Sequence, residues 1–189
     1  MMTIQPHLPM DNATFLDWVQ GREGRYELAG GRVVMMTGGT RGHGLIISNL
    51  LALLHSRLDR KRWTVLTDFG IDVGPGTVRY PDIVIDQHGA RRGALSAQAP
   101  VLIAEVLSPS TMKIDLGDKA AEYLQLHGLA AYLIFAQDEL KAWVFSRGGD
   151  GPFPPGPQIF AGGDASIGIP TLGLDLRLAD IYDGIDFAD

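Results

Sequence analysis

The chain has 189 residues, of which 22 are acidic and 16 basic, giving a formal net charge of −6, and it contains no cysteine. This length is sufficient for one domain with a substantial buried core, and we predict a single domain over residues 1–189. The lack of cysteine excludes disulfide bonds, a thiol nucleophile and cysteine-bound zinc or iron–sulfur clusters, so any metal must have oxygen or imidazole ligands.

The chain lacks the sequence features of a membrane or secreted protein. Its longest apolar runs, at 45–54 and 101–107, are shorter than the roughly 20 residues of a membrane-spanning helix. Residues 1–9 have neither a basic start nor an apolar core, so they do not resemble a signal peptide. We therefore expect a soluble, cytoplasmic protein.

Apolar spacing and turn-forming residues predict the secondary structure of the first half of the chain. Two segments have helical spacing, Gly30-Gly31 predicts a tight hairpin turn, and an unbroken apolar run indicates a strand covered on both faces. The predicted elements, in chain order, are a helix at 11–20, a hairpin at 26–29 and 32–36, a long helix at 43–60, and strands at 65–73, 78–85 and 101–107.

The second half begins with the sequence Ser-Pro-Ser-Thr at 108–111, which ends the central strand and is suited to cap a helix. We predict that this helix runs to about His127, with Tyr123 and His127 on its inner face. The later elements are strands at 131–136 and 140–146 and, in a Gly/Pro-rich acidic extension at 147–189, a strand near 158–161 and a helical turn near 178–182. This order predicts an α/β fold, with a mixed sheet flanked by helices.

Glu105 stands inside the apolar run that predicts the central strand. A lone ionised carboxylate there would cost several kcal/mol, so it needs a cation, hydrogen bonds or a raised pKa. Asp82 follows Pro81 at the start of another apolar run, and the two carboxylates would converge if their strands are neighbours. Such a pair, with waters, suits Mg²⁺. The alternatives are a strand-end hydrogen bond for Asp82 and a structural ion pair for Glu105.

The predicted helix after the central strand offers a cation. Asp115, Lys119 and Tyr123 are spaced four residues apart and share one helical face. The chain has only four lysines against twelve arginines, so Lys119 is a notable candidate. The alternative is a solvent-exposed pair with Asp115, which would contribute little to stability.

Several motifs together resemble one protein family. They are Tyr-Glu-Leu at 26–28 before the Gly-Gly turn, His43 at the start of the long helix, Tyr-Pro-Asp-Ile-Val at 80–84, and most specifically Glu-Val-Leu-Ser-Pro-Ser-Thr at 105–111 with Asp115 and Lys119 downstream. With these motifs the chain resembles the Uma-type restriction endonuclease family, part of the PD-(D/E)XK nuclease superfamily. The resemblance extends over about 15–145.

The resemblance implies a restriction-endonuclease-like core over about 15–146 and a metal-dependent phosphodiesterase that acts on DNA. Asp82, Glu105 and the carbonyl group of Val106 would bind Mg²⁺ or Mn²⁺. The metal would lower the pKa of a bound water and neutralise charge on the phosphate. A lysine, matched here by Lys119, would orient that water and stabilise the transition state.

Three further residues are supporting candidates by the same resemblance or by position. Glu27 matches an acidic position of the family and would bind the metal directly or through water. His43 would hydrogen-bond a carboxylate or a phosphate, although helix capping explains it equally well. Tyr123 shares a helical face with Lys119. A homodimer would suit the cutting of two strands, but no sequence feature requires one.

One residue departs from the superfamily pattern. Leu107 occupies the position two after Glu105 where the superfamily usually has its lysine, and strand alternation places both on one face. Members of the family that the chain resembles share this feature, and Lys119 matches the displaced lysine better than Lys113 does. The alternatives are a catalytically silent nuclease-fold module that acts in binding or assembly, and a nuclease that acts on RNA.

The charge distribution bears on the partner. Residues 1–147 contain 15 basic and 15 acidic residues, whereas 148–189 contain seven aspartates and one arginine. The expected core is therefore neutral, which permits weak, metal-dependent binding of DNA. Arg57, Arg60, Lys61 and Arg62 cluster at a helix end, where they are either solvated cations favoured by the helix dipole or phosphate contacts.

Overall fold

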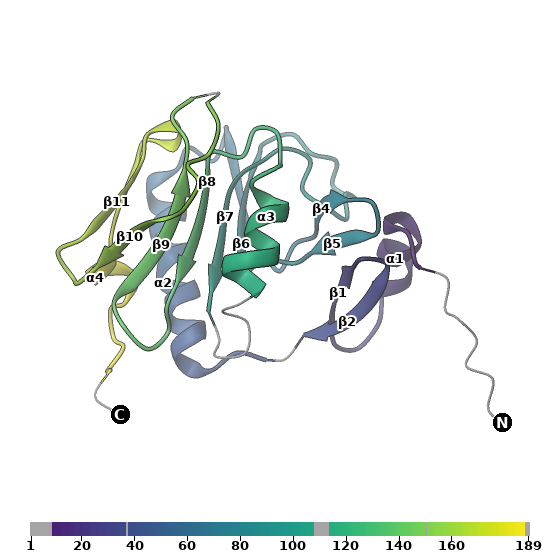
Figure 1. Cartoon of the computed structure of the whole chain (residues 1–189), viewed down its shortest axis with the longest axis horizontal. Coiled ribbons are helices and arrows are strands. Elements are labelled where there is room, and N and C mark those ends of the chain that lie inside the picture. Colours follow the sequence, from purple (N-terminus) through teal and green to yellow (C-terminus); the bar gives the residue numbers. More distant parts are fainter. Residues whose placement is uncertain (1–8, 37, 108–113, 150, 188–189) are drawn as a thin grey trace.

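The computed structural model describes residues 9–36, 38–107, 114–149 and 151–187, without the side chains of residues 114 and 115. Figure 1 shows a large central sheet with helices on both faces and a smaller sheet beside it. The helices are α1 (Asn12–Val19), α2 (Arg41–Arg57), a π-helical turn η1 (Ile114–Lys119), α3 (Ala120–Tyr123), a 3₁₀ turn η2 (Pro170–Leu172) and α4 (Leu178–Ile181). The predicted α/β class is confirmed.

The central sheet has six strands in the order β10-β9-β8-β7-β6-β3, and its neighbours are antiparallel except for the parallel pair β7 and β8. These strands are β3 (Trp63–Thr67), β6 (Ile83–Gln87), β7 (Pro100–Val106), β8 (Ala131–Phe135), β9 (Lys141–Ser146) and β10 (Gln158–Ala161). Every residue of β7 is buried, as expected for a strand in the middle of a sheet with both faces covered.

The smaller sheet is antiparallel with the order β2-β1-β5-β4, and a two-stranded sheet pairs β11 with β12. Their strands are β1 (Arg25–Ala29), β2 (Arg32–Met36), β4 (Ile71–Gly74), β5 (Thr77–Arg79), β11 (Ser166–Ile169) and β12 (Leu174–Arg177). The predicted hairpin is confirmed: both residues of the Gly30-Gly31 turn have positive φ, which glycine adopts without strain. Helix α1 packs on this sheet, where its Phe15 joins an apolar cluster with Leu28 of β1 and Val78 of β5.

Strand alternation divides the apolar core between two faces of the central sheet. Leu102, Ala104 and Val106 of β7 belong to the cluster that includes α2 and the C-terminal elements. Ile103 and Leu107 belong to the cluster on the other face, where α3 lies (Figure 1). Glu105 is in step with the second set, so its side chain is on the α3 face.

Two predicted strands are each divided between the two sheets. The segment 65–73 separates into β3 and β4 because Asp68 has a positive φ of 49° and interrupts the extended chain. The segment 78–85 separates into β5 and β6 around Pro81, which has no N–H group to donate to a ladder. Within residues 65–85 the chain therefore crosses between the two sheets twice, and Asp82 lies at the second of these crossings.

The helix predicted after the central strand is shorter than expected. Its helical part ends at Tyr123 because tight turns follow, in which the N–H group of Leu126 donates to the Tyr123 carbonyl group. Gly128 then takes a positive φ of 88°, and His127 is exposed rather than on the inner face. The predicted cap at 108–111 lies outside the described residues.

The C-terminal segment packs on the central sheet and on α2. Strand β10 extends the sheet, and the Asn49 amide of α2 donates to the carbonyl groups of Ile181 and Asp183. The Tyr182 hydroxyl lies 2.7 Å from the carbonyl oxygen of Ala136. Residues after 147 therefore contribute to the core that supports β7. Within the described residues, no helix combines the length and apolar character needed to cross a membrane.

Candidate active site

Asp82 and Glu105 lie close to each other where β6 begins and β7 ends. The two strands are antiparallel neighbours with Ile83 opposite Ala104, which places Asp82 across from Glu105. The N–H group of Val106 donates to Asp82 Oδ2 over 2.8 Å, and both carboxylates are buried. The expectation that the two strands are neighbours is confirmed.

Two described side chains from the segment that follows the central strand donate hydrogen bonds to Glu105. Lys119 Nζ lies 2.8 Å from Glu105 Oε1, and the Tyr123 hydroxyl donates to the same oxygen over 3.2 Å. All three side chains are buried. Burial and the charge of Glu105 raise the pKa of the Tyr123 hydroxyl well above its ordinary value, so it stays a donor. These groups stabilise the carboxylate inside its apolar strand.

Glu27 of β1 connects the smaller sheet to the same cluster. Its carboxylate accepts from the Tyr80 N–H group at 3.1 Å and from the Arg79 guanidinium at 3.2 Å, and it lies 3.7 Å from Lys119 Nζ. Arg79 also forms two hydrogen bonds, of 2.7 and 2.8 Å, with the Glu122 carboxylate of α3. Burial lowers the pKa of Arg79, but its bonds to Glu122 and the charge of Glu27 outweigh that effect and raise it. Arg79 therefore stays a fixed cation.

His43 reaches the other carboxylate. Its Nε2 lies 3.2 Å from Asp82 Oδ2, while its N–H group donates to the N-cap hydroxyl of Thr40. Helix capping by His43 is therefore not seen, because Thr40 is the N-cap residue, and the His43 ring contacts Asp82 instead. Gly39 is needed beside this ring, since a Cβ there would meet His43 Nδ1 at 2.5 Å.

Sequence reasoning missed Arg79, Glu122 and Asp68. Arg79 stands three residues before Asp82 and Glu122 three after Lys119, and this spacing beside the named candidates is the only sequence indication. Asp68 forms an ion pair with Arg25 at the break between β3 and β4. Burial raises the pKa of the Asp68 carboxyl, Arg25 lowers it in part, and Asp82 raises it further.

Leu107 and Lys119 occupy the places that the sequence predicted for them. Leu107 is buried in the apolar cluster on the α3 face, and no amine comes from that position. Lys119 is only 6% exposed, so it is not a surface ion pair. Lys113 and the side chain of Asp115 lie outside the described parts of the chain.

The oxygen ligands fit a hard divalent cation. Among the described residues, no group of three or more His, Asp or Glu side chains surrounds a common point. A Mg²⁺ ion bound at Asp82 and Glu105 would need waters and a main-chain oxygen as further ligands.

Comparison with known proteins assigns the family. The model of the Uma2 family, described as "Putative restriction endonuclease", matches residues 13–179. The uncharacterized protein slr1290 of Synechocystis sp. is 26% identical over 179 residues, which cover 92% of this chain and 91% of that protein.

A solved structure shares the fold. The crystal structure of "a putative nuclease belonging to DUF820" from Anabaena variabilis matches with a TM-score of 0.74 and 18% sequence identity, covering 92% of this chain and 98% of that one. The resemblance predicted from the motifs is confirmed, and the chain belongs to the Uma2 family of restriction-endonuclease-like proteins.

Proposed function

We propose that this protein is a metal-dependent endonuclease that hydrolyses phosphodiester bonds of DNA. The observation that carries the proposal is the contact of 2.8 Å between Lys119 Nζ and Glu105 Oε1, directly beside the strand pair that joins Glu105 to Asp82. Two neighbouring carboxylates that can hold a metal, with an amine beside one of them, suit metal-assisted phosphodiester hydrolysis. The family description supports the same activity.

The metal would be held by Asp82, Glu105 and the carbonyl group of Val106. Bound there, Mg²⁺ or Mn²⁺ would lower the pKa of a water and offset charge on the phosphate. Asp82 is oriented for this role by the Val106 N–H group and by His43, which both contact Oδ2. Such fixed orientation keeps a ligand in place before the metal arrives.

Lys119 would stabilise negative charge on the reacting phosphate and orient the attacking water. Its ammonium is fixed between Glu105 and Glu27, at 2.8 and 3.7 Å, so no rearrangement of the lysine is needed at the moment of reaction. Arg79 fixes Glu27 in turn, and Tyr123 fixes Glu105. Glu27 and Tyr123 thus act through Lys119 and Glu105 rather than on the substrate.

A second function has one observation in its favour. Tyr123 is fully buried and Leu107 is 2% exposed, so both fill the space beside Glu105, and Lys119 is buried with them. A site enclosed in this way also suits a nuclease fold that binds or assembles without cutting. The ion pair would then serve stability alone.

Cleavage assays distinguish the two functions. Supercoiled plasmid DNA and a structured RNA are incubated with the protein in Mg²⁺, Mn²⁺ or EDTA, and nicked and linear products are measured over time. The endonuclease should cut plasmid only with metal, and Lys119→Met should reduce the rate at least about 100-fold. Cleavage of RNA alone would reassign the substrate. An intact plasmid under every condition would favour the silent module.

A further inference from the structure

The basic cluster predicted at the end of α2 is rearranged in the structure. Arg57 is not part of the cluster, because its guanidinium contacts the Asp175 carbonyl group and lies 3.4 Å from the Asp180 carboxylate. Two arginines from the segment between β6 and β7 lie beside the remaining three cations. The result is a basic patch of five exposed cations, defined as Arg60, Lys61, Arg62, Arg91 and Arg92.

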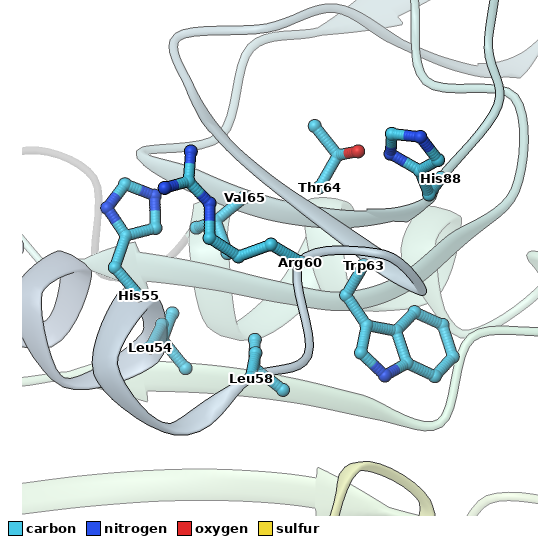
Figure 2. Close-up of a pocket in the computed structure, with 8 residues that line it drawn as sticks. All are labelled: Leu54, His55, Leu58, Arg60, Trp63, Thr64, Val65 and His88. Atoms are coloured by element: carbon cyan, nitrogen blue, oxygen red, sulfur yellow. The ribbon is translucent and has the colours of Figure 1, made fainter.

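Two adjoining pockets lie beside this basic patch, one towards each face of the edge strand β3. The first, of about 200 Å³, lies against α2, and Figure 2 shows the nitrogen-bearing side chains of His55, Arg60 and His88 around it. The second, of about 300 Å³, has Arg91, Arg92 and Asp86 among its lining residues. Thr64 and His88 line both pockets. A hydrogen bond of 2.9 Å from the His88 N–H group to the Arg62 carbonyl group joins the two halves.

The charges of this patch are only partly offset by nearby carboxylates. Within the described ranges no carboxylate forms an ion pair with any of its five cations, and Arg62 instead lies over the Trp63 ring at 5.4 Å. The nearby carboxylates of Asp59 and Asp86 accept hydrogen bonds from main-chain N–H groups. The five cations exceed these two carboxylates, so the patch has a net positive charge in a chain whose net charge is −6.

We propose that the basic patch binds the phosphodiester backbone of nucleic acid at a place separate from the catalytic carboxylates. Arginine, lysine and histidine side chains donate hydrogen bonds that phosphate oxygens accept. A chain with excess negative charge needs a local positive surface of this kind to attract a polyanion. The choice of nucleic acid rests on the proposed function.

The position of the patch separates binding from chemistry. Asp82 precedes β6 and His88 follows it, and the strand between them spans about 13 Å at 3.3 to 3.4 Å per residue. Substitutions in the patch should therefore leave Asp82, Glu105 and Lys119 undisturbed. A bound duplex would contact the protein at the site of cleavage and again at the edge of the sheet.

Strand β3 is an edge strand, and charges beside an edge also prevent strands of two copies from pairing. If the charges only prevent such pairing, removing them would cause self-association without a specific loss of nucleic-acid binding. Light scattering detects this outcome.

The test measures binding of a fluorescein-labelled DNA duplex by anisotropy in EDTA, where metal-dependent cutting cannot interfere, over a series of salt concentrations. The patch variant is Arg60→Glu/Arg91→Glu. The matched control is Arg32→Glu/Arg177→Glu, which changes the net charge equally at two exposed positions elsewhere. The patch variant should bind at least about tenfold more weakly, and its plot of log affinity against log salt should be flatter by about 2. The control should bind nearly as the wild type does.

Four outcomes would overturn the inference. They are unchanged binding by the patch variant, an equal loss in the control, self-association as the only effect, and displacement of the duplex by millimolar inorganic phosphate, which would assign the pockets to a free anion. Failure of the proposed nuclease function would be seen separately, in the cleavage assay. Patch-dependent binding by a protein that cuts nothing would leave this inference standing and refute the nuclease.

Discussion

Lys119 Nζ lies 2.8 Å from Glu105 Oε1, so the cation that compensates the carboxylate of the central strand comes from the segment that follows this strand. Strand alternation directs Glu105 to the α3 face, and η1 brings the amine to the same face. Two residues after Glu105, on the same face, the chain has the apolar Leu107. The contact therefore supplies, from a different element, a charge pair that the strand itself lacks.

The contact predicts strong coupling between the two residues. Lys119→Met should lower the free energy of unfolding by about 3 to 5 kcal/mol, because it removes a bonded cation from a buried carboxylate. The double variant Lys119→Met/Glu105→Gln should lose clearly less than the sum of the single changes. Urea denaturation of the four proteins measures this cycle. Additive losses would show that the two side chains do not interact.

Arg79 should matter for stability through its geometry as well as its charge. Arg79→Lys keeps the charge but cannot form both bonds to Glu122, so we expect a loss of about 1 to 3 kcal/mol in urea denaturation. The control is Lys141→Met, which breaks a more exposed pair with Glu139 and should cost at most about 1 kcal/mol. Equal losses in the two variants would contradict the structural role of Arg79.

The buried Tyr123 hydroxyl should make the folded protein less stable in alkaline solution. Its pKa is raised by burial and by Glu105, so above about pH 10 the unfolded chain releases this proton while the folded chain retains it. The free energy of unfolding should then fall as pH rises, by up to about 1.4 kcal/mol per unit for this group. Below pH 10 the folded and unfolded chains both keep the proton, so Tyr123 does not make the free energy of unfolding depend on pH.

Denaturation between pH 8 and 11 checks this dependence. The pKa values of Tyr80 and Tyr182 are also raised, mainly by burial, so part of the slope should remain in Tyr123→Phe. The variant should nevertheless show a flatter decline than the wild type. Identical slopes would mean that the Tyr123 hydroxyl ionises alike in both states.

Variants of His43 and Thr40 test two roles separately, the orientation of Asp82 and the capping of α2. His43→Ala should reduce metal-dependent cleavage about 10- to 100-fold, as expected for a group that orients a metal ligand. Thr40→Ala should cost about 1 kcal/mol of stability through the lost N-cap and leave cleavage nearly unchanged. The two variants are compared in plasmid cleavage and in thermal unfolding. Loss of activity in Thr40→Ala alone would reverse the assignment.

Local patterns were sufficient to predict much of the fold. The Gly30-Gly31 hairpin, the long helix α2 and the buried strand β7 follow from turn chemistry and apolar spacing, which depend on neighbouring residues only. The divided strands could not be predicted in this way. Asp68 and Pro81 break an otherwise continuous apolar alternation, and the choice between two sheets depends on partners far away in the chain.

The candidate site shows the same limit. Glu105 was identifiable because a charge in an apolar strand is anomalous, and Lys119 because it is spaced along a helical face from Tyr123. Arg79 and Glu122 looked like ordinary charged residues, and their two hydrogen bonds exist only because the small sheet packs beside α3. Long-range pairs of this kind have no local sequence pattern.

The most direct test of the proposed nuclease compares two aspartates at opposite ends of β6. Asp82→Asn removes a charge from the proposed metal site, whereas Asp86→Asn changes a buried carboxylate that accepts main-chain hydrogen bonds about 13 Å away. In Mg²⁺ or Mn²⁺, the account predicts that Asp82→Asn cuts supercoiled plasmid at least about 100-fold more slowly, while Asp86→Asn, where folded, cuts at nearly the wild-type rate. Equal cutting by the wild type and folded Asp82→Asn would contradict it.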